Sequence, residues 1–357
     1  MALKEIMDRL FDFEFDVITA RLDRHMSKED RIGNINVYRV GFGSVLDKFL
    51  LPVLGFLKSM ELMNKNSYLA SHSYQVSYGA GAAYLSKLFF KNIPLIITVQ
   101  EGKNLEKQGF FINFFRRWII RKADFATAIS EYLKDYILTV KKDLKTDVIP
   151  NGVDLENFSK NFSYGETAAL EDKLGIKPDD KVIISVSRLV YKNGLDLVIK
   201  SLAVLNNNSR SKYKLILAGS GPLKESLRFQ VKNLKLDDYV IFAGTVSHRD
   251  LPLYFKISDV FARLSRSEGL GSAFLEAMAA GIPIIGPKIG GIPDFLEDRK
   301  TGLFCSHEPE DIAFKVNVIF ENEKLKQEII KNARKLIEEK YDWNIIAGKF
   351  KKLYSAL

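Results

Sequence analysis

The chain has 357 residues, of which 46% are hydrophobic and 27% charged, and its formal net charge is +9. This length allows two α/β domains of ordinary size, and the composition excludes a disordered or membrane-spanning protein. A single cysteine, Cys305, excludes an intrachain disulfide, and no apolar stretch suited to a secretory signal follows Met1, so we expect a cytoplasmic protein.

Short apolar runs alternate with helical patterns along the whole chain. The first predicted element is a helix from Lys4 to Phe11, which a strand at 15–19 follows. Further strands are predicted at 36–40, 94–99, 148–150, 181–186, 214–218, 240–243, 260–262, 282–285 and 302–305, with helices at 195–205, 223–233 and 272–280. This alternation predicts the α/β class, with parallel sheets covered by helices on both faces.

The positive charge is concentrated in residues 87–147, which hold 12 Lys and Arg against 7 Asp and Glu. Within this segment, residues 110–122 mix aromatic with basic side chains. Two interpretations stay open: a core helix with a solvated basic face, or a helix that lies on an anionic membrane. Nucleic acid is not expected as a partner, because no nucleic-acid-binding motif accompanies the charge.

A domain boundary is predicted near Pro150-Asn151-Gly152, where three residues that break regular structure follow a strand. A charged helical connector at 166–174 then leads to a new strand at Lys181. The predicted domains are residues 1–160 and 161–341.

The segment that follows the predicted strand at 260–262 is the most informative in the chain. Glu268 and Glu276 bracket a Gly-x-Gly turn that ends at Gly271, and Ser272 is the predicted N-cap of the next helix. The N–H groups at this helix start, including that of Ala273, would form an anion site. A phosphate site between two carboxylates that can bind hydroxyls suits a nucleotide-sugar.

Other candidate residues follow neighbouring strands. Arg188 and Lys192 lie in the loop after 181–186, where a guanidinium and an ammonium would neutralise a diphosphate. Gly219, Gly221 and Val246 follow the strands at 214–218 and 240–243, at the carboxyl ends where open α/β sheets bind ligands.

Glu268-x7-Glu276, followed by Ala-Met-Ala-Ala-Gly-Ile-Pro, resembles the signature of the retaining glycosyltransferases of family 4, which have the GT-B fold. Residues 123–132 and 150–154 resemble further elements of that family. The resemblance implies two Rossmann-like domains that face each other across a cleft. The N-terminal domain would be on the acceptor side, with the C-terminal helix 342–357 joined to it, and residues 161–341 would bind the donor.

The resemblance also implies roles for individual residues. Glu268 would lie against the donor sugar, and Glu276 would bind the ribose. Arg188 would bind the diphosphate, but the usual lysine position holds Asn193, with Lys192 one place earlier. The predicted catalytic residues are therefore Glu268, Arg188 and Lys192, and the predicted donor-binding residues are Glu276, Gly271, Ser272, Ala273, Gly219, Gly221, Val246 and Asn193.

The N-terminal half departs from the family in three respects. The usual first strand and Gly-rich loop are absent, which would leave an unpaired strand edge in the middle of a sheet. Gln100 and Glu101 stand where relatives often have a catalytic-site His-Gly pair. His72 follows an apparent strand end at 68–70 and has either an acceptor-side role or a structural one.

The chain has no Asp-x-Asp pair and no Cys/His cluster at metal-ligand spacing. We therefore expect a protein that is independent of metal ions and has no cofactor. The family resemblance implies a retaining hexosyltransferase that uses a UDP- or GDP-linked sugar as co-substrate. The acceptor would be a glycan or a lipid-linked molecule, with possible contact at the inner membrane face. The alternatives are a nucleotide-sugar-binding protein or partner subunit without activity and, less favoured, an epimerase or phosphorylase of similar fold.

Overall fold

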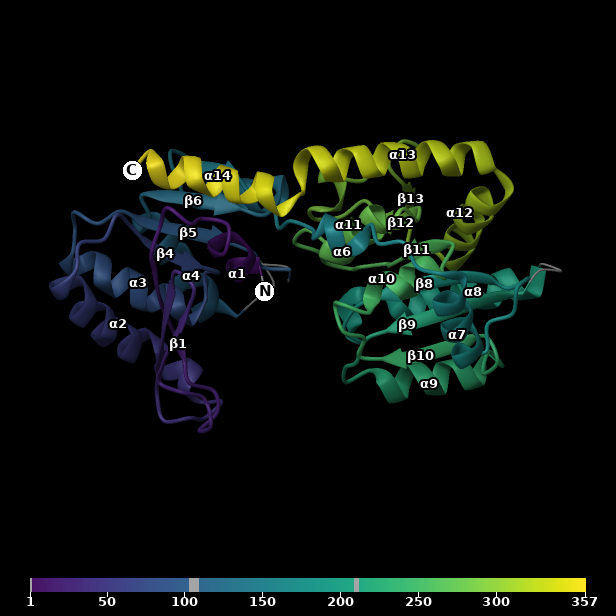
Figure 1. Ribbon diagram of the computed structural model, residues 1–357, viewed down its shortest axis with the longest axis horizontal. Coiled ribbons are helices and arrows are strands. Elements are labelled where there is room, and N and C mark those ends of the chain that lie inside the picture. Colours follow the sequence, from purple (N-terminus) through teal and green to yellow (C-terminus); the bar gives the residue numbers. More distant parts are fainter. Residues whose placement is uncertain (1, 103–108, 209–211) are drawn as a thin grey trace. The chain divides into compact units, whose positions relative to one another are not determined.

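The computed structural model describes residues 2–102, 109–208 and 212–357. The chain divides into two compact units, each with α/β structure (Figure 1). Unit 1 comprises Met1–Gly152 and Trp343–Leu357, and unit 2 comprises Val153–Asp342.

The division falls a few residues before the predicted boundary at 160. Helix α6 (Leu155–Phe158) belongs to unit 2, because its side chains pack there. The amide of Asn157 donates to the carbonyl oxygen of His248 at 3.0 Å, and the ring of Phe158 contacts the His248 ring at 5.0 Å.

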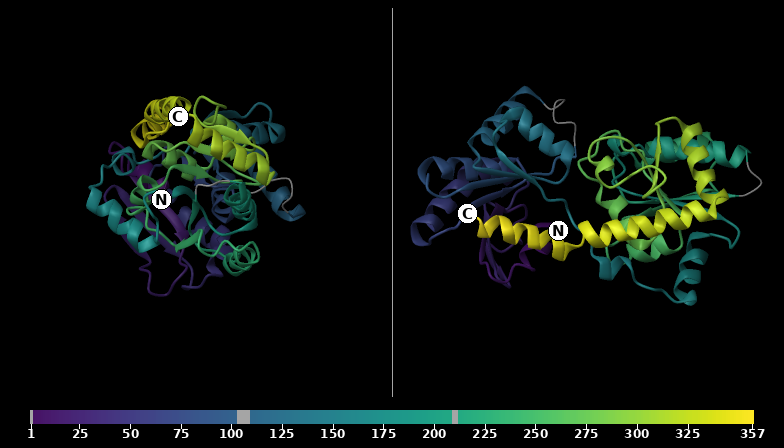
Figure 2. Two further views of the ribbon diagram at one scale, coloured as in Figure 1. Left: turned by 90° about the vertical axis from the view of Figure 1, so that its right-hand side faces the viewer. Right: turned by 90° about the horizontal axis from the view of Figure 1, so that it is seen from above.

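Unit 2 contains one sheet of six strands that are all parallel, in the order β10-β9-β8-β11-β12-β13. Helices cover both faces of this sheet (Figures 1 and 2). The strands are β8 (Lys181–Val186), β9 (Tyr213–Ala218), β10 (Val240–Gly244), β11 (Val260–Ala262), β12 (Ile284–Pro287) and β13 (Leu303–Cys305). The helices are α7 (Tyr164–Leu174), α8 (Leu195–Asn208), α9 (Lys224–Asn233), α10 (Leu251–Lys256), α11 (Ser272–Ala280), α12 (Pro309–Glu321) and α13 (Glu323–Lys340), with short 3-10 turns at Tyr191–Asn193 and Ile292–Asp294.

The core of unit 2 forms because its strands are apolar on both faces, as parallel strands between two helix layers require. Ile183, Leu215 and Val260 pack with Val198 of α8 and Val316 of α12, and all five are buried. Cys305 is also buried, and burial raises the pKa of its thiol to about 12, which fits a structural residue.

Unit 1 has two separate sheets. Strands β1 (Phe15–Ala20), β3 (Ile35–Val40) and β2 (Glu29–Ile32) form one sheet in the order β1-β3-β2. The other is a parallel sheet in the order β4-β5-β6-β7, formed by β4 (Ser71–Tyr74), β5 (Leu95–Val99), β6 (Phe125–Ala128) and β7 (Lys145–Val148). The predicted strand at 148–150 was therefore placed too late, because Pro150 has no N–H to give to a ladder.

The helices of unit 1 are α1 (Ala2–Met7), α2 (Asp47–Lys65), α3 (Tyr78–Phe89), α4 (Phe110–Lys122), α5 (Glu131–Val140) and α14 (Trp343–Ser355). Although α14 is the last element of the chain, it lies along the β4–β7 sheet (Figure 1). A buried cluster holds it there, in which Ile6 of α1, Ile96 of β5 and Phe350 of α14 meet.

Candidate active site

The predicted donor-binding residues of unit 2 all follow the carboxyl ends of its strands. In chain order from β8, the strand order is 3-2-1-4-5-6, so the order reverses between β8 and β11. Ligands of open α/β sheets bind in the crevice outside the strand ends at such a reversal. Arg188 follows β8 and Glu268 follows β11, so the two residues come from the two strands that flank this point.

The loop after β8 carries Arg188 and is stabilised by a hydrogen bond from Asn193. The Arg188 side chain is exposed, whereas Asn193 is only 3% exposed and its Nδ2 donates to the Arg188 carbonyl oxygen at 2.7 Å. The carbonyl oxygen of Lys192 accepts from the backbone N–H of Arg266 at 2.6 Å, which ties this loop to the one after β11. Asn193 therefore shapes the loop, and Arg188 and Lys192 are the cationic residues that the loop carries.

The turn after β9 packs closely against the same loop. Gly219 has φ +144°, and a Cβ there would lie 1.9 Å from the carbonyl oxygen of Ser187. The backbone N–H of Gly219 donates to the Gly244 carbonyl oxygen at 2.6 Å, which joins this turn to the end of β10. Gly221 lies in the same turn, and the partly exposed Val246 follows β10, so both are at the same sheet edge as Arg188.

Glu268 is held in the loop after β11 by groups on several sides. Its side chain is 8% exposed and forms an ion pair with the buried Arg263, and its Oε1 accepts from the N–H of Gly269 at 3.1 Å. A Cβ on Gly290 would lie 2.0 Å from the Glu268 carbonyl oxygen, so only glycine allows that backbone approach. The carboxylate is therefore fixed in one place, as a group that positions a sugar hydroxyl must be.

Helix α11 begins at Ser272, and its N-cap is Gly271 with φ +100°, so the prediction of Ser272 as the N-cap was wrong. The glycine takes the cap position because the chain adopts a left-handed conformation there, which Ser272 would adopt only at a cost. The N–H of Phe274 donates to the Gly271 carbonyl oxygen at 2.9 Å. The N–H groups of Ser272 and Ala273 are the first of the helix and have no acceptor within it.

The accessible positions of α11 lie on one face of the helix. Ser272, Ala273 and Glu276 are partly exposed, whereas Phe274, Leu275 and residues 277–279 are buried. Positions three and four apart share a face of a helix. Glu276 therefore lies on the same face as Ser272 and Ala273, one turn after the N–H groups of these two residues. Its Oε1 is 3.4 Å from Nε2 of His248.

Three contacts around this site were not predicted from the sequence. Arg263 lies beneath Glu268, and burial lowers its pKa to about 10, which still leaves it cationic at neutral pH. Arg266 makes a bidentate ion pair with Asp196 at 2.8 and 2.7 Å, which raises the pKa of the guanidinium. The only feature of the sequence that could have indicated the ion pair of Arg263 is a charged residue directly after an apolar strand. No pattern in the sequence indicates the contact of His248 with Glu276.

The acceptor-side candidates lie in unit 1. Gln100 and Glu101 follow β5. The pKa of the Glu101 carboxyl is raised above its usual value, because the effect of burial exceeds the opposing effect of nearby Arg116. His72 lies within β4 and not after a strand. Its Nε2 is 2.7 Å from Thr98 Oγ1 and its Nδ1 is 2.7 Å from the Tyr354 hydroxyl, so both ring nitrogens have partners inside unit 1.

Helix α4 reverses the arrangement expected of a core helix. Phe110 and Phe111 are 77% and 75% exposed, and Phe114, Phe115 and Trp118 are also exposed. Arg116 is buried at 4% exposure. The solvated basic face is present, because Arg117, Arg121 and Lys122 are exposed while Ile119 and Ile120 are buried. The aromatic side chains, however, do not lie in the core.

Neither a metal-binding cluster nor a membrane-spanning helix is present among the described residues. No group of three or more His, Cys, Asp or Glu side chains within them is arranged to hold a metal ion. None of the helices they form is long and apolar enough to span a bilayer.

Comparison with known proteins identifies the family of the chain. Residues 166–336 match the family model of glycosyl transferases group 1, and residues 8–157 match that of glycosyltransferase family 4. The chain belongs to the group 1 glycosyltransferases of family 4. It is 27% identical to an uncharacterized glycosyltransferase of Methanocaldococcus jannaschii, over 96% of this chain and 89% of the relative.

Other relatives carry more informative names. An alpha-monoglucosyldiacylglycerol synthase of Streptococcus pneumoniae is 27% identical over 70% of this chain and 58% of its own length. Sucrose-phosphate synthase from Thermosynechococcus elongatus has the same fold, with a TM-score of 0.85, 19% identity and coverage of 99% of this chain and 92% of that one. Anabaena HepE, solved with UDP and glucose, has a TM-score of 0.75 at 22% identity, over 90% of this chain and 86% of its own. This family 4 chain therefore has the GT-B fold.

Proposed function

We propose that this protein is a metal-independent, retaining glycosyltransferase that moves a hexosyl unit from a UDP- or GDP-sugar to a hydroxyl of a glycan or lipid-linked acceptor. The single observation that carries this proposal is the strand reversal in unit 2. It sets Arg188 at one strand end and Glu268 at the neighbouring one, with the start of α11 beside them. Each feature matches one part of a nucleotide-sugar: charge for the diphosphate and carboxylates for the hydroxyls.

In the proposed reaction the bond between the anomeric carbon and the diphosphate oxygen breaks, and the acceptor oxygen bonds to that carbon. Negative charge grows on the diphosphate as it leaves. Arg188, Lys192 and the first N–H groups of α11 would stabilise this charge without a metal ion. Glu268 would hold the sugar and Glu276 the ribose, while the departing phosphate takes the acceptor proton on the same face.

The first test removes Arg188, because its exposed side chain can be truncated without a cavity. We expect Arg188→Ala to lower kcat/KM for sugar transfer by about 100- to 1000-fold, as the loss of one donor to a developing oxyanion does. Lys232→Ala, which removes a charge exposed on α9, is the matched control and should change nothing. Equal rates in both variants would contradict the site assignment.

Two finer parts of the proposal have separate measurements. Transfer should persist in excess EDTA if no metal ion takes part. The anomeric configuration of the product, read by proton NMR, should equal that of the donor. Inversion at the anomeric carbon would contradict the retaining mechanism and leave the assignment of the donor site intact.

A second candidate is a nucleotide-sugar-binding protein without transferase activity, which the two separate sheets of unit 1 favour. Titration calorimetry with UDP and GDP, run beside a turnover assay, distinguishes the two. Tight binding without diphosphate release in an acceptor screen would favour the second candidate. Release that depends on the acceptor would favour the first.

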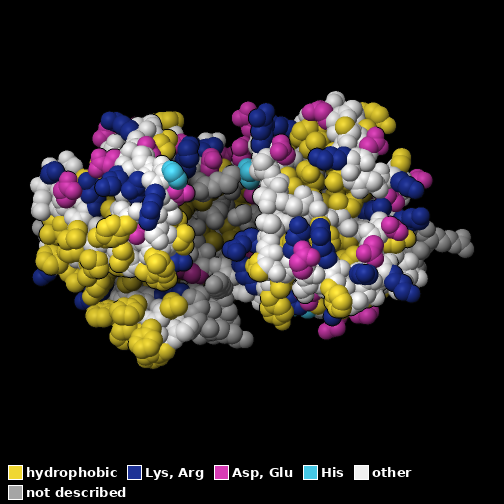
Figure 3. Space-filling model, turned by 90° about the horizontal axis from the view of Figure 1, so that it is seen from below, with side chains coloured by type: hydrophobic (Ala, Val, Ile, Leu, Met, Phe, Trp, Pro, Cys, Tyr) yellow, Lys and Arg dark blue, Asp and Glu magenta, His cyan; other side chains and the backbone are white. Residues whose placement is uncertain are grey.

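Contact with an anionic membrane at the inner face is proposed through α4, where exposed aromatic side chains precede Arg117, Arg121 and Lys122. Hydrophobic side chains gather on unit 1 (Figure 3). Ring contacts link the helices, since Tyr84 of α3 meets Trp118 of α4. Aromatic rings insert at the headgroup level while lysine and arginine attract anionic lipid, so the combination suits a bilayer surface.

Sedimentation with phosphatidylglycerol vesicles tests this contact. The double variant Phe110→Ser/Phe114→Ser should lose at least about tenfold in vesicle affinity, because two apolar anchors are removed. Phe314→Ser in unit 2, also an exposed aromatic at 61%, is the matched control and should bind as the unaltered protein does. Equal loss in both variants would contradict a role for α4.

A further inference from the structure

His248 is a residue of unit 2 that the proposed reaction does not use. It lies in the loop of residues 245–250, between β10 and α10, two residues after Val246. Its ring is partly exposed, and its Nε2 lies 3.4 Å from Oε1 of Glu276 on α11. The carboxylate that we expect to bind the ribose therefore has an imidazole ring as its direct neighbour.

Hydrogen bonds on both sides fix the backbone around His248. Asn157 of α6 is buried, and its Nδ2 donates to the His248 carbonyl oxygen at 3.0 Å. On the other side, Ser247 Oγ donates to Asp250 Oδ2 at 2.7 Å and accepts from the N–H of Asp250 at 3.2 Å. This second pair of bonds closes the turn that precedes α10. The loop is therefore tied to α6 and to the start of α10.

The imidazole ring is also held in place. Phe158 of α6, which is 2% exposed, meets it edge to face, with the ring centroids 5.0 Å apart. The Phe158 ring contacts Phe255 of α10 at 6.0 Å in turn. Helices α6, α10 and α11 lie close together in unit 2 (Figure 1). The ring of His248 is thus packed against one helix while its Nε2 faces the carboxylate of another.

The contact with Glu276 assigns a hydrogen-bonding role to each partner. A carboxylate only accepts hydrogen bonds, so we place the proton of the His248 ring on Nε2. The two oxygens of a carboxylate offer about four acceptor positions. One contact with His248 therefore leaves room for Glu276 to accept from both hydroxyls of a ribose.

A held carboxylate binds a diol better than a mobile one. A glutamate side chain loses rotamer freedom when it is fixed, and a partner that fixes it before the ligand arrives removes that cost from binding. Glu276 lies on the accessible face of α11 and is partly exposed, so the helix alone does not fix its carboxylate. His248, whose backbone and ring are both held, supplies the missing restraint.

We propose that His248 is a positioning residue of the donor site, which holds Glu276 in the rotamer that accepts the 2′- and 3′-hydroxyls of the ribose. His248 would thereby give the site its preference for a ribonucleotide. This inference rests on the proposed function, because it takes Glu276 as the residue that binds the ribose. His248 acts through Glu276 and needs no contact of its own with the donor.

The test compares nucleotides with and without the two ribose hydroxyls. Titration calorimetry measures the Kd of UDP, GDP and their 2′,3′-dideoxy forms for the unaltered protein and for two variants. His248→Phe keeps an aromatic ring beside Phe158 but removes the donor, whereas His248→Gln keeps an N–H donor. We expect His248→Phe to weaken binding of the preferred ribonucleotide by at least about tenfold, as the loss of a hydrogen bond to a charged group does.

The dideoxy nucleotide separates positioning from a general structural role. It has no hydroxyls for Glu276 to bind, so its Kd should change by less than about twofold in His248→Phe. His248→Gln should bind the ribonucleotide more tightly than His248→Phe does. In a Glu276→Gln background, His248→Phe should have little further effect, because the two residues act as one unit.

The matched control is His25→Phe, which makes the same change at an exposed position of unit 1. It should leave the Kd of every nucleotide as it is in the unaltered protein. A loss in His25→Phe as large as that in His248→Phe would overturn the proposal.

The outcomes distinguish this inference from the proposed function. If the unaltered protein binds neither UDP nor GDP, the proposed function fails and this inference fails with it. If it binds one of them, the donor site stands, and the inference is overturned by either of two results. In the first, His248→Phe weakens the ribonucleotide and its dideoxy form equally, or weakens neither. In the second, the unaltered protein does not distinguish the two forms.

Discussion

The sheet of unit 2 is continuous, whereas the strands of unit 1 form two sheets with a groove between them. Both units use parallel strands and crossover helices, so the difference lies in pairing and not in fold class. In unit 2 every interior strand has two neighbours, and the loops at the strand ends are fastened to one another. In unit 1, β1 and β4 are edge strands of their sheets, and among the described residues no strand lies between them.

This difference teaches that the proposed donor-binding residues of unit 2 are anchored by the fold, whereas an acceptor-side candidate of unit 1 has both ring nitrogens engaged within that unit. Glu268 is anchored by a buried arginine, and the loop with Arg188 is fastened to its neighbours. His72, an acceptor-side candidate, uses both ring nitrogens to hold β4 to its surroundings. We therefore expect substitutions in the two units to differ in their effects on activity and on stability.

The largest effect is expected from Glu268→Ala. It leaves Arg263 buried without its ion-pair partner, which typically costs about 3–5 kcal/mol of folding stability. The variant should lose transfer activity and also unfold at lower denaturant concentration. Urea unfolding followed by circular dichroism, beside the turnover assay, measures both.

The control for this prediction removes both partners. Arg263→Met combined with Glu268→Gln takes away the buried charges together, so most of the stability should return while transfer stays absent. If the double variant is as unstable as Glu268→Ala, the ion pair is not the cause of the loss. If it regains activity, Glu268 has no part in the reaction.

The next effect concerns His72 and pH. Burial lowers its pKa from 6.5 to about 4, so the unfolded state binds more protons than the folded state between these values. The stability contribution is complete above pH 6.5 and is lost as pH falls toward 4, by roughly 3 kcal/mol. Fluorescence of Trp118 and Trp343 follows unit 1 through urea unfolding at each pH.

His72→Gln should flatten this pH dependence, and the exposed His25→Gln should leave it as it is. The slope with pH is the quantity to compare, because His72→Gln also loses hydrogen bonds and is less stable at every pH. An unchanged slope in His72→Gln would show that another group titrates in this range.

A smaller effect is expected where backbone turns meet in unit 2. Gly219→Ala places a Cβ 1.9 Å from the Ser187 carbonyl oxygen at φ +144°, so the loop with Arg188 must shift. Backbone strain of this kind costs roughly 1–3 kcal/mol, and calorimetry should show weaker UDP or GDP binding. Gly165→Ala in α7 has no atom within 4 Å of the new Cβ and should be neutral or slightly stabilising.

Much of unit 2 could be predicted from sequence because strand and helix patterns alternate there without interruption. The strands at 181–186 and 260–262 have the predicted bounds. Strand β4 was missed because Ser71-His72-Ser73-Tyr74 has no apolar alternation, and its stability comes from contacts with distant residues such as Thr98 and Tyr354. The role of Arg263 was missed for a similar reason. Its contact with Glu268 depends on the conformation of the loop after β11, which the spacing of the two residues in the sequence does not reveal.

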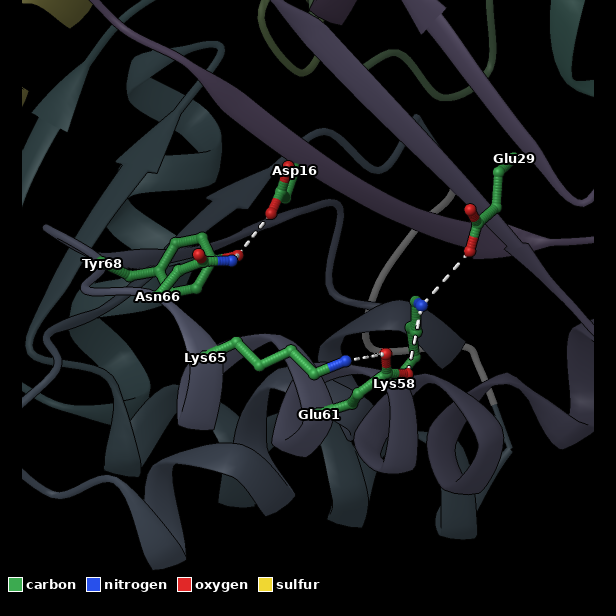
Figure 4. Close-up of polar contacts among 7 residues, drawn as sticks. All are labelled: Asp16, Glu29, Lys58, Glu61, Lys65, Asn66 and Tyr68. Atoms are coloured by element: carbon green, nitrogen blue, oxygen red, sulfur yellow. Dashed lines mark hydrogen bonds and ion pairs between the residues drawn. The ribbon is translucent and has the colours of Figure 1, made fainter.

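The smallest effect concerns the polar contact that bridges the two sheets of unit 1. Tyr68→Phe removes the hydroxyl that donates to Asp16 (Figure 4), while Asp16 keeps its bond from Asn36, so we expect a loss of roughly 1–2 kcal/mol. Burial and Asp16 raise the pKa of Tyr68 to about 12, so the hydroxyl is a donor throughout the neutral range. Tryptophan fluorescence during urea unfolding measures the change in unit 1.

Tyr164→Phe, which alters a tyrosine 86% exposed on α7, controls for the loss of a hydroxyl. Because Tyr164 makes no side-chain bond to either sheet of unit 1 within the described parts of the chain, its variant should keep the stability of the unaltered protein. If Tyr164→Phe loses as much stability as Tyr68→Phe, the bond from Tyr68 to Asp16 is not the cause of the loss.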